Sequence, residues 1–207
     1  GQGKLTPELR DRIENCTSKT ELEDLYLPYR PKRRTRATVA REKGLEPLAQ
    51  QISQLNKTGE AVKSLDELAT NFIIDGVSDA AAALQGAADI LAEGIAERSE
   101  LRAYVRQTLL KTGLISSKIK PDYPEGSTKY EMYRRYESAI AKLAPHNLLA
   151  LLRGDKEGIL KVSLVGDETK ILEHLEYSQI RTKQTNVRQF YQTLIKDAFS
   201  RLMKTSL

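Results

Sequence analysis

Residues 78–112 carry the strongest periodic signal in the chain. Apolar side chains recur there at three- and four-residue intervals, which is the spacing of one face of an α-helix. Gly113 provides a C-terminal stop and Ser99 can cap a new helix, so we expect one long helix, or two with a break near Ser99. We expect six residues of this stripe to be buried core: Leu84, Leu91, Ile95, Leu101, Val105 and Leu109.

Most other segments also predict helices. Thr6-Pro7 is a helix start with a cap and a first-turn proline, and Pro47 suits the first turn of another helix. The exception is residues 159–165, where Leu160, Val162 and Leu164 alternate with more polar neighbours. We therefore predict an all-α protein with several short helices, one or two long ones, and at most one short β-strand or hairpin near 159–165.

A run of turn-forming residues interrupts the helical pattern at 119–128. It contains Pro121, Pro124 and Gly126, which punctuate secondary structure. We expect this run to be a linker between a helical region at 1–118 and a second helical region, with the short β-element, at 129–207. Because the chain begins without methionine or a leader, we also expect it to be a fragment of a longer protein.

The composition is that of an ordinary globular protein, with 40% hydrophobic and 29% charged residues. No apolar run approaches the roughly 18 residues that span a bilayer, so we expect no membrane contact. The single cysteine, Cys16, excludes an internal disulfide and favours a reducing compartment, which predicts a cytoplasmic location.

The segment from Lys19 to Ala49 combines three different kinds of sequence. An acidic amphipathic stretch ends near Pro28, because proline disfavours helical geometry in the residue before it. An unneutralised cationic block follows, consisting of Arg30, Lys32, Arg33, Arg34, Arg36 and Arg41. Thr35 can cap a short helix that Gly44 ends, so the block leads into a folded helical region.

This segment resembles the signature of the Tex family of bacterial transcription accessory proteins. The likeness is near-identical in residue type and order over Leu22–Pro31, Lys32–Ala40 and Gly44–Ala49, and a looser likeness continues to about Leu164. The resemblance implies a cytoplasmic nucleic-acid-binding factor whose full chain joins a helical region containing a helix-turn-helix to RNase H-like, helix-hairpin-helix and S1 RNA-binding domains. We find no S1-like five-strand pattern here, so the family's RNA-binding parts do not transfer to these residues.

The charge of the chain is segregated. The formal net charge is +5, but Arg30–Arg41 contributes +6 and Ser178–Leu207 contributes +5, which leaves −6 on the remainder. Such segregation is typical of a polyanion footprint, although a charge run is as often a solvated helix face. In the C-terminal block, Arg188 and Lys196 lie on an amphipathic helical stretch and are candidates for phosphate contact.

Three tyrosines at three-residue spacing, Tyr130, Tyr133 and Tyr136, are interleaved with cations. Tyrosines of this kind can stack on nucleic-acid bases. Packing against a core is the favoured interpretation, because aromatic burial supplies the larger routine free energy.

The residues give little sign of catalysis. The two histidines, His146 and His174, have no partners at metal-ligand spacing, and phosphate-binding loops and nucleophile elbows are absent from the sequence. Glu21, Glu23 and Asp24 are better explained by capping and the helix dipole than by chemistry. We therefore expect a protein that is not an enzyme and uses no cofactor or metal.

Two functions remain open. In the first, the chain is a helical module that contacts RNA or DNA through its phosphates, with low sequence specificity. In the second, it is a scaffold that packs against other domains of the same full-length protein or against RNA polymerase, and its cations neutralise acidic protein surfaces.

Overall fold

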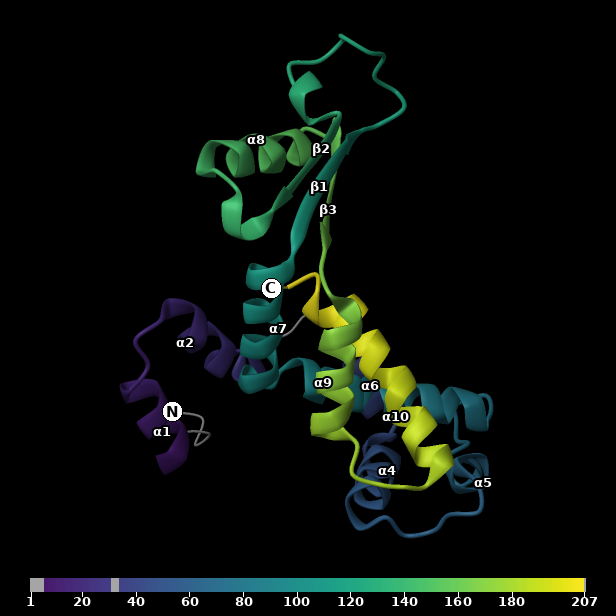
Figure 1. Ribbon diagram of the computed structural model, residues 1–207. Coiled ribbons are helices and arrows are strands. Elements are labelled where there is room, and N and C mark those ends of the chain that lie inside the picture. The colour runs from purple at the N-terminus through teal and green to yellow at the C-terminus, as the bar shows by residue number, and fades with distance from the viewer. Residues whose placement is uncertain (1–5, 31–33, 207) are drawn as a thin grey trace. The chain divides into compact units, whose positions relative to one another are not determined.

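The computed structural model describes residues 6–30 and 34–206. The chain divides into two compact units, unit 1 from residues 1–103 and 172–207 and unit 2 from residues 104–171. The described residues form ten α-helices and one three-stranded antiparallel sheet, which confirms the mostly helical fold class (Figure 1). The predicted division at 119–128 differs from this one, because that stretch lies within unit 2.

Unit 1 is organised around the helix α6, Ala80–Ala96, against which α3, α4, α5, α10 and the π-helix η4 pack. The other elements assigned largely to this unit are α1 (Pro7–Glu14), α2 (Lys19–Tyr26), η1 (Leu27–Tyr29), α3 (Arg36–Glu42), α4 (Glu46–Thr58), α5 (Leu65–Thr70), α9 (Glu168–Gln179), α10 (Thr185–Asp197) and η4 (Ala198–Met203). Small residues on α6 let these helices approach closely: a Cβ at Gly86 would meet Leu45 and Ala40.

The predicted break in the long apolar stripe is confirmed, since α6 ends at Ala96 and α7 spans Ser99–Thr112. Ile95, Leu101, Val105 and Leu109 are buried as predicted. Leu84 and Leu91 are less deeply buried than these four residues and keep an intermediate exposure. The inward face of α6 is instead made by Ala83, Ala87 and Ile90, because several helices crowd around it and only short side chains fit at most inward positions.

Unit 2 is a sheet with strand order β2-β1-β3, formed by β1 (Leu114–Ile119), β2 (Arg135–Ala139) and β3 (Leu160–Val165). Helix α8, Pro145–Lys156, packs against β3 and lies along one side of the sheet (Figure 1). The expected β-element at 159–165 is β3. The expectation that it would be the only one was wrong, because β1 and β2 carry serine, lysine and arginine on their outward face and so lack a clear apolar run.

Within the stretch at 119–128, Ile119 is the last residue of β1, and residues 120–128 form most of the connection to the short 3₁₀-helix η2, Glu131–Tyr133. Arg134 holds part of it, because its Nη2 donates a hydrogen bond to the carbonyl oxygen of Pro124 at 2.9 Å. The same guanidinium hydrogen-bonds to Glu131 and lowers the pKa of that carboxyl to about 2. A second 3₁₀-helix in this unit, η3, spans Ile140–Lys142.

The three tyrosines do not share a helix. Tyr130 directly precedes η2, Tyr133 is the last residue of η2, and Tyr136 lies on β2. Tyr130 and Tyr133 are buried with Ile115, Ile119, Leu151 and Leu160 in the core of unit 2. The Tyr133 hydroxyl donates to Oδ1 of Asn147 at 2.9 Å. Packing is therefore confirmed over a free stacking surface. Gly154 of α8 closes this core, since a Cβ there would lie 2.5 Å from Leu160 Cδ1 and 3.2 Å from Tyr130 Cδ1.

Candidate nucleic-acid interface

The basic segment, defined as Arg30–Arg41, starts where η1 ends and continues through most of α3. Lys32 and Arg33 lie outside the described residues; Arg30, Arg34, Arg36 and Arg41 are described and exposed. The local signals act as expected. The Thr35 hydroxyl accepts a hydrogen bond from the Thr38 amide at 3.0 Å, and Gly44 has a left-handed backbone (φ +72°) just after α3.

Arg41 is bound by two acids of the same unit. Its Nε lies 2.9 Å from Glu46 Oε2, and its Nη1 lies 2.8 Å from Glu93 Oε2 on α6. Glu93 has 9% of its side chain exposed and also accepts a hydrogen bond from the Thr35 hydroxyl at 2.9 Å. Burial lowers the pKa of Arg41, but the hydrogen bonds and charges of Glu93 and Glu46 outweigh it and raise the pKa. Arg41 therefore joins α3 to α6.

Arg34 also has an acidic partner, but a solvent-exposed one. Its Nη2 lies 3.0 Å from Glu42 Oε2, and the two side chains are 71% and 53% exposed. An exposed pair of this kind contributes about 0–1 kcal/mol to stability. Arg34 can therefore exchange Glu42 for a phosphate at little cost to the fold.

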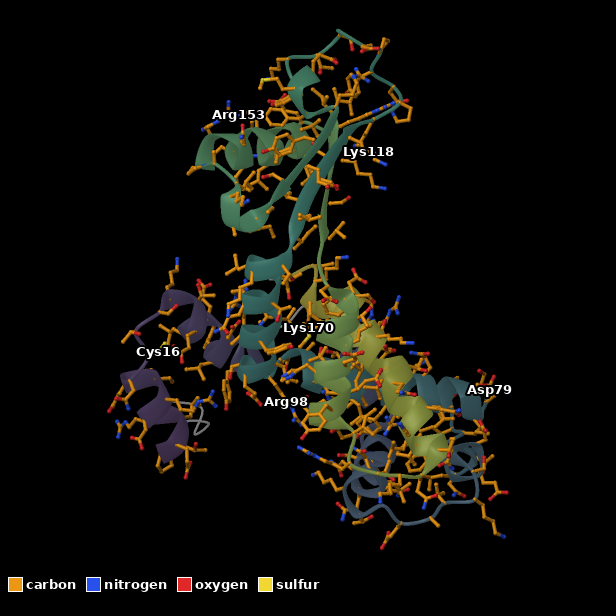
Figure 2. All side chains as sticks on the ribbon, viewed as in Figure 1. Cys16, Asp79, Arg98, Lys118, Arg153 and Lys170 are labelled. Carbon is orange, nitrogen blue, oxygen red and sulfur yellow. The ribbon has the colours of Figure 1, made fainter. Side chains whose placement is uncertain are left out.

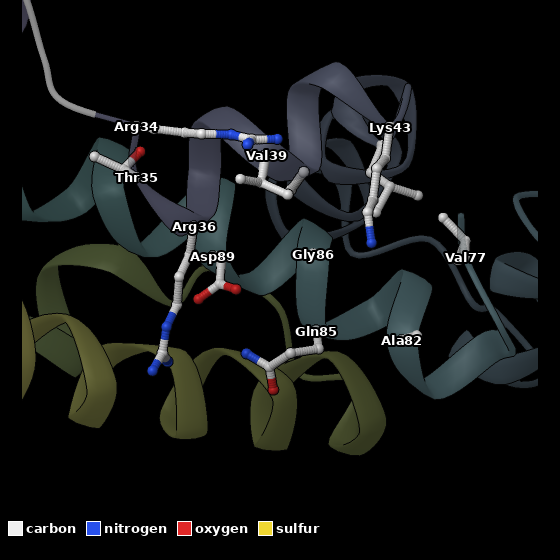
Figure 3. Close-up of a pocket in the computed structure, with 12 residues that line it drawn as sticks. Arg34, Thr35, Arg36, Val39, Lys43, Val77, Ala82, Gln85, Gly86 and Asp89 are labelled. Carbon is white, nitrogen blue, oxygen red and sulfur yellow. The ribbon is translucent and has the colours of Figure 1, made fainter. Parts of the chain in front are cut away.

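An open cavity of about 620 Å³ lies between α3 and α6 (Figure 3). Its lining is largely apolar, with Arg34, Arg36 and Lys43 adding three positive charges. Burial raises the pKa of Asp89 in this cavity, and the positive charges of Arg201 and Arg36 act in the opposite direction. Arg36 thus extends past a buried carboxylate of α6, yet it forms no ion pair with a residue in the described ranges.

The C-terminal candidates Arg188 and Lys196 lie on the exposed side of α10, away from its buried face of Val187, Tyr191, Leu194 and Ile195. Neither forms an ion pair with any residue that the structure describes. Both α3, which holds part of the basic segment, and α10, which holds Arg188 and Lys196, pack against α6. Arg36 lines a second cavity together with Gln189 and Thr193 of α10.

The acidic residues before the basic segment were predicted to act through helix capping and the helix dipole, and Asp24 has a different role. Glu21 lies in the first turn of α2 and fits the dipole interpretation. Asp24 lies in the second half of α2 and is buried, with its Oδ1 2.7 Å from Nε of Arg102. Arg102 also donates to the hydroxyl and carbonyl oxygens of Ser206. Asp24 is therefore part of a buried ion pair.

Sequence reasoning missed a row of cations in unit 2. Lys118 on β1 is directly opposite Arg135 on β2 and directly opposite Lys161 on β3. All three are exposed. The row could have been found only by predicting β1, β2 and their register, because the three residues are well separated in the sequence.

Within 6–30 and 34–206, histidine, cysteine, aspartate and glutamate side chains do not gather in groups of three that could hold a metal ion. The same ranges contain no helix that is both long enough and apolar enough to cross a membrane.

Comparison with known proteins places these features in a family. The family model described as "Tex central region-like" matches residues 61–205. YdcI of Bacillus subtilis is 39% identical over 207 residues, which is all of this chain and 28% of the relative. Protein tex of Bordetella pertussis is 42% identical over 164 residues, which is 78% of this chain and 20% of the relative.

The "Transcriptional accessory protein Tex" of Neisseria gonorrhoeae is 37% identical over 188 residues, which is 90% of this chain and 24% of the relative. The chain thus spans between a fifth and three tenths of the length of these relatives. Since the family model covers more than half of the sequence, the chain belongs to the Tex family, and its residues 61–205 match the part of the family described as central.

Proposed function

We propose that this chain is a non-enzymatic, nucleic-acid-binding part of a cytosolic transcription accessory factor. It contacts phosphates of RNA or DNA with low sequence specificity through the basic segment and α10. The name of the Neisseria gonorrhoeae relative, a transcriptional accessory protein, supports the biological setting.

The observation that supports the proposal is a set of exposed cations that form no ion pair with any described residue. Arg30, Arg36, Arg188 and Lys196 belong to this set. Arg36 lies on α3, and Arg188 and Lys196 lie on α10; both helices pack on α6, whereas Arg30 directly follows η1. Exposed lysine and arginine side chains are the groups that neutralise nucleic-acid phosphates and release condensed counterions. Contacts of this kind position a protein on a strand but do not read its bases.

The geometry divides the predicted contact residues by role. Arg36, Arg188 and Lys196 are available for phosphates, and Arg34 becomes available when it leaves Glu42. Arg41 is engaged by Glu46 and Glu93, so in this proposal it supports the fold and contributes little to binding.

The second candidate function is a scaffold that docks on another domain of the same full-length protein or on RNA polymerase. The pairing of Arg34 and Arg41 with acids favours it, because these cations already show affinity for carboxylates. In this case the exposed cations would meet an acidic protein surface in place of a phosphate chain.

Fluorescence anisotropy with a labelled mixed-sequence oligonucleotide, measured across a salt series, tests the first function. The variant Arg36→Ala with Arg188→Ala should flatten the slope of log affinity against log salt by about 1.4 on single strands, or about 1.8 on duplex. The charge-matched control, Lys63→Ala with Lys111→Ala, removes two exposed cations elsewhere and should leave the slope unchanged.

A third variant separates binding from folding. Arg41→Ala should lower thermal stability and change the salt slope little, because the residue is tied to α6. If Arg36→Ala with Arg188→Ala binds the oligonucleotide as the unmodified chain does, the nucleic-acid function is wrong for these residues and the scaffold becomes the better proposal.

A further inference from the structure

The open face of the sheet in unit 2 carries an arrangement that the basic segment does not explain. Lys118 faces Arg135 on one side and Lys161 on the other, so three positive side chains form one row across all three strands. Directly opposed side chains in an antiparallel sheet have Cβ atoms about 4.5–5.5 Å apart. Like charges at this separation repel each other and weaken the sheet.

No described acid neutralises the row by an ion pair. Glu137 is the acidic residue on the same face, two positions along β2 from Arg135 and diagonal to Lys118. A diagonal neighbour lies about 7–8 Å away, which a long side chain can reach, but among the described residues Glu137 forms no ion pair with a member of the row. The row therefore keeps a net positive charge and its mutual repulsion, with one carboxylate, Glu137, in the adjacent row.

The opposite face of the sheet is the buried one. Ile115, Ile119 and Leu160 point into the core of unit 2 with Leu151 of α8, whereas Lys118 projects away from the side on which α8 lies (Figure 2). The adjacent row on the open face contains Glu137 on β2 and, directly opposite each other on β1 and β3, Ser116 and Ser163. Their hydroxyls are hydrogen-bond donors that suit phosphate oxygens.

We propose that this face, the row of Lys118, Arg135 and Lys161 with the hydroxyls of Ser116 and Ser163, is a binding surface for the phosphate backbone of a nucleic-acid strand. Charge complementarity selects the partner, because a polyanion would turn the repulsion among the three cations into three favourable contacts. The aromatic side chains nearby, Tyr133 and Tyr136, belong to the core side, so this surface offers no stacking platform and holds the strand without reading its bases.

The surface is independent of the basic segment, because its residues all belong to unit 2 and the basic segment belongs to unit 1. It deepens the proposed function by adding a second site for the same class of partner. The two proposals fail separately, since each is tested by substitutions in its own unit.

The test uses the whole chain and the triple variant Lys118→Gln, Arg135→Gln, Lys161→Gln. Anisotropy with a labelled single-stranded DNA of mixed sequence should show the salt slope reduced by about 2, which corresponds to three lost contacts. Thermal stability should stay the same or rise, because the substitution removes like-charge repulsion. The charge-matched control, Lys111→Gln, Lys142→Gln, Lys156→Gln, changes three exposed lysines of the same unit and should keep the original slope.

Three results would overturn the proposal. An unchanged salt slope in the triple variant shows that the row makes no phosphate contact, even if the variants in the basic segment lose binding. A clear fall in the Tm of the triple variant, together with its loss of oligonucleotide affinity, shows that the row stabilises the fold and that the lost binding reflects unfolding. Tighter binding of the unmodified chain to poly-L-glutamate than to the oligonucleotide, abolished by the triple variant, assigns the surface to an acidic protein partner.

Discussion

The ion pair between Asp24 and Arg102 provides the sharpest test of how unit 1 is held together. Nε of Arg102 lies 2.7 Å from Oδ1 of Asp24, and each side chain is only 6% exposed. The guanidinium also donates to Ser206 Oγ at 3.0 Å and to the Ser206 carbonyl oxygen at 3.1 Å. One buried residue therefore connects α2, α7 and the segment after η4.

The perturbation is Arg102→Met, which keeps most of the side-chain volume and removes the charge and its donors. It leaves the Asp24 carboxylate buried without its guanidinium, and breaking a buried pair in this way costs about 3–5 kcal/mol. For a chain of this size the corresponding fall in Tm is about 6–20 °C, because each kcal/mol moves Tm by about 2–4 °C. The double variant Arg102→Met with Asp24→Leu should recover much of the loss, because no buried charge remains.

The free energy of unfolding of the four chains in this double-mutant cycle is measured by urea denaturation. The matched control is the exposed pair of Arg34 and Glu42, where Arg34→Met should cost no more than about 1 kcal/mol. A loss below about 1 kcal/mol in Arg102→Met, or a coupling energy near zero in the cycle, would refute the reasoning that this pair is dry and structurally required.

Three further predictions concern other parts of the chain. In thermal unfolding, Gly154→Ala should destabilise unit 2 by about 1–3 kcal/mol, because the added methyl group overpacks the core. In the same assay the control Gly94→Ala should stabilise α6 by up to about 1 kcal/mol, because a Cβ there meets nothing within 4 Å. NMR titration should place the pKa of Glu131 at about 2, and Arg134→Gln should raise that pKa toward the ordinary 4.5. Because the folded pKa is depressed, the stabilisation that the Glu131–Arg134 pair provides is present above pH 4.5 and is lost as the pH falls toward 2. Asn56→Ala should cost about 2–4 kcal/mol in urea denaturation, because the buried amide of Asn56 binds three backbone groups of the connection between α9 and α10; a loss below about 1 kcal/mol would contradict that role.

Local signals predicted much of the candidate interface in unit 1. Thr35 and Gly44 bound the short helix α3 as expected, and the exposure of Arg36, Arg188 and Lys196 follows from their place opposite apolar helix faces. The partner of Arg41 could not be predicted in the same way. Glu93 is 52 residues away, and only the packing of α3 on α6 brings its carboxylate within hydrogen-bonding distance.

The sequence alone predicted most of the helices and a possible break near Ser99, because helical hydrogen bonds and caps join residues at most a few positions apart. It also carried the resemblance to the Tex family. Tertiary structure decided which of the apolar residues are buried, as Leu84 and Leu91 show, and it decided the role of Asp24, whose arginine lies 78 residues away. It also decided the sheet of unit 2. Strand pairing joins distant segments, so the register that aligns Lys118 with Arg135 and Lys161 exists only once the chain has folded.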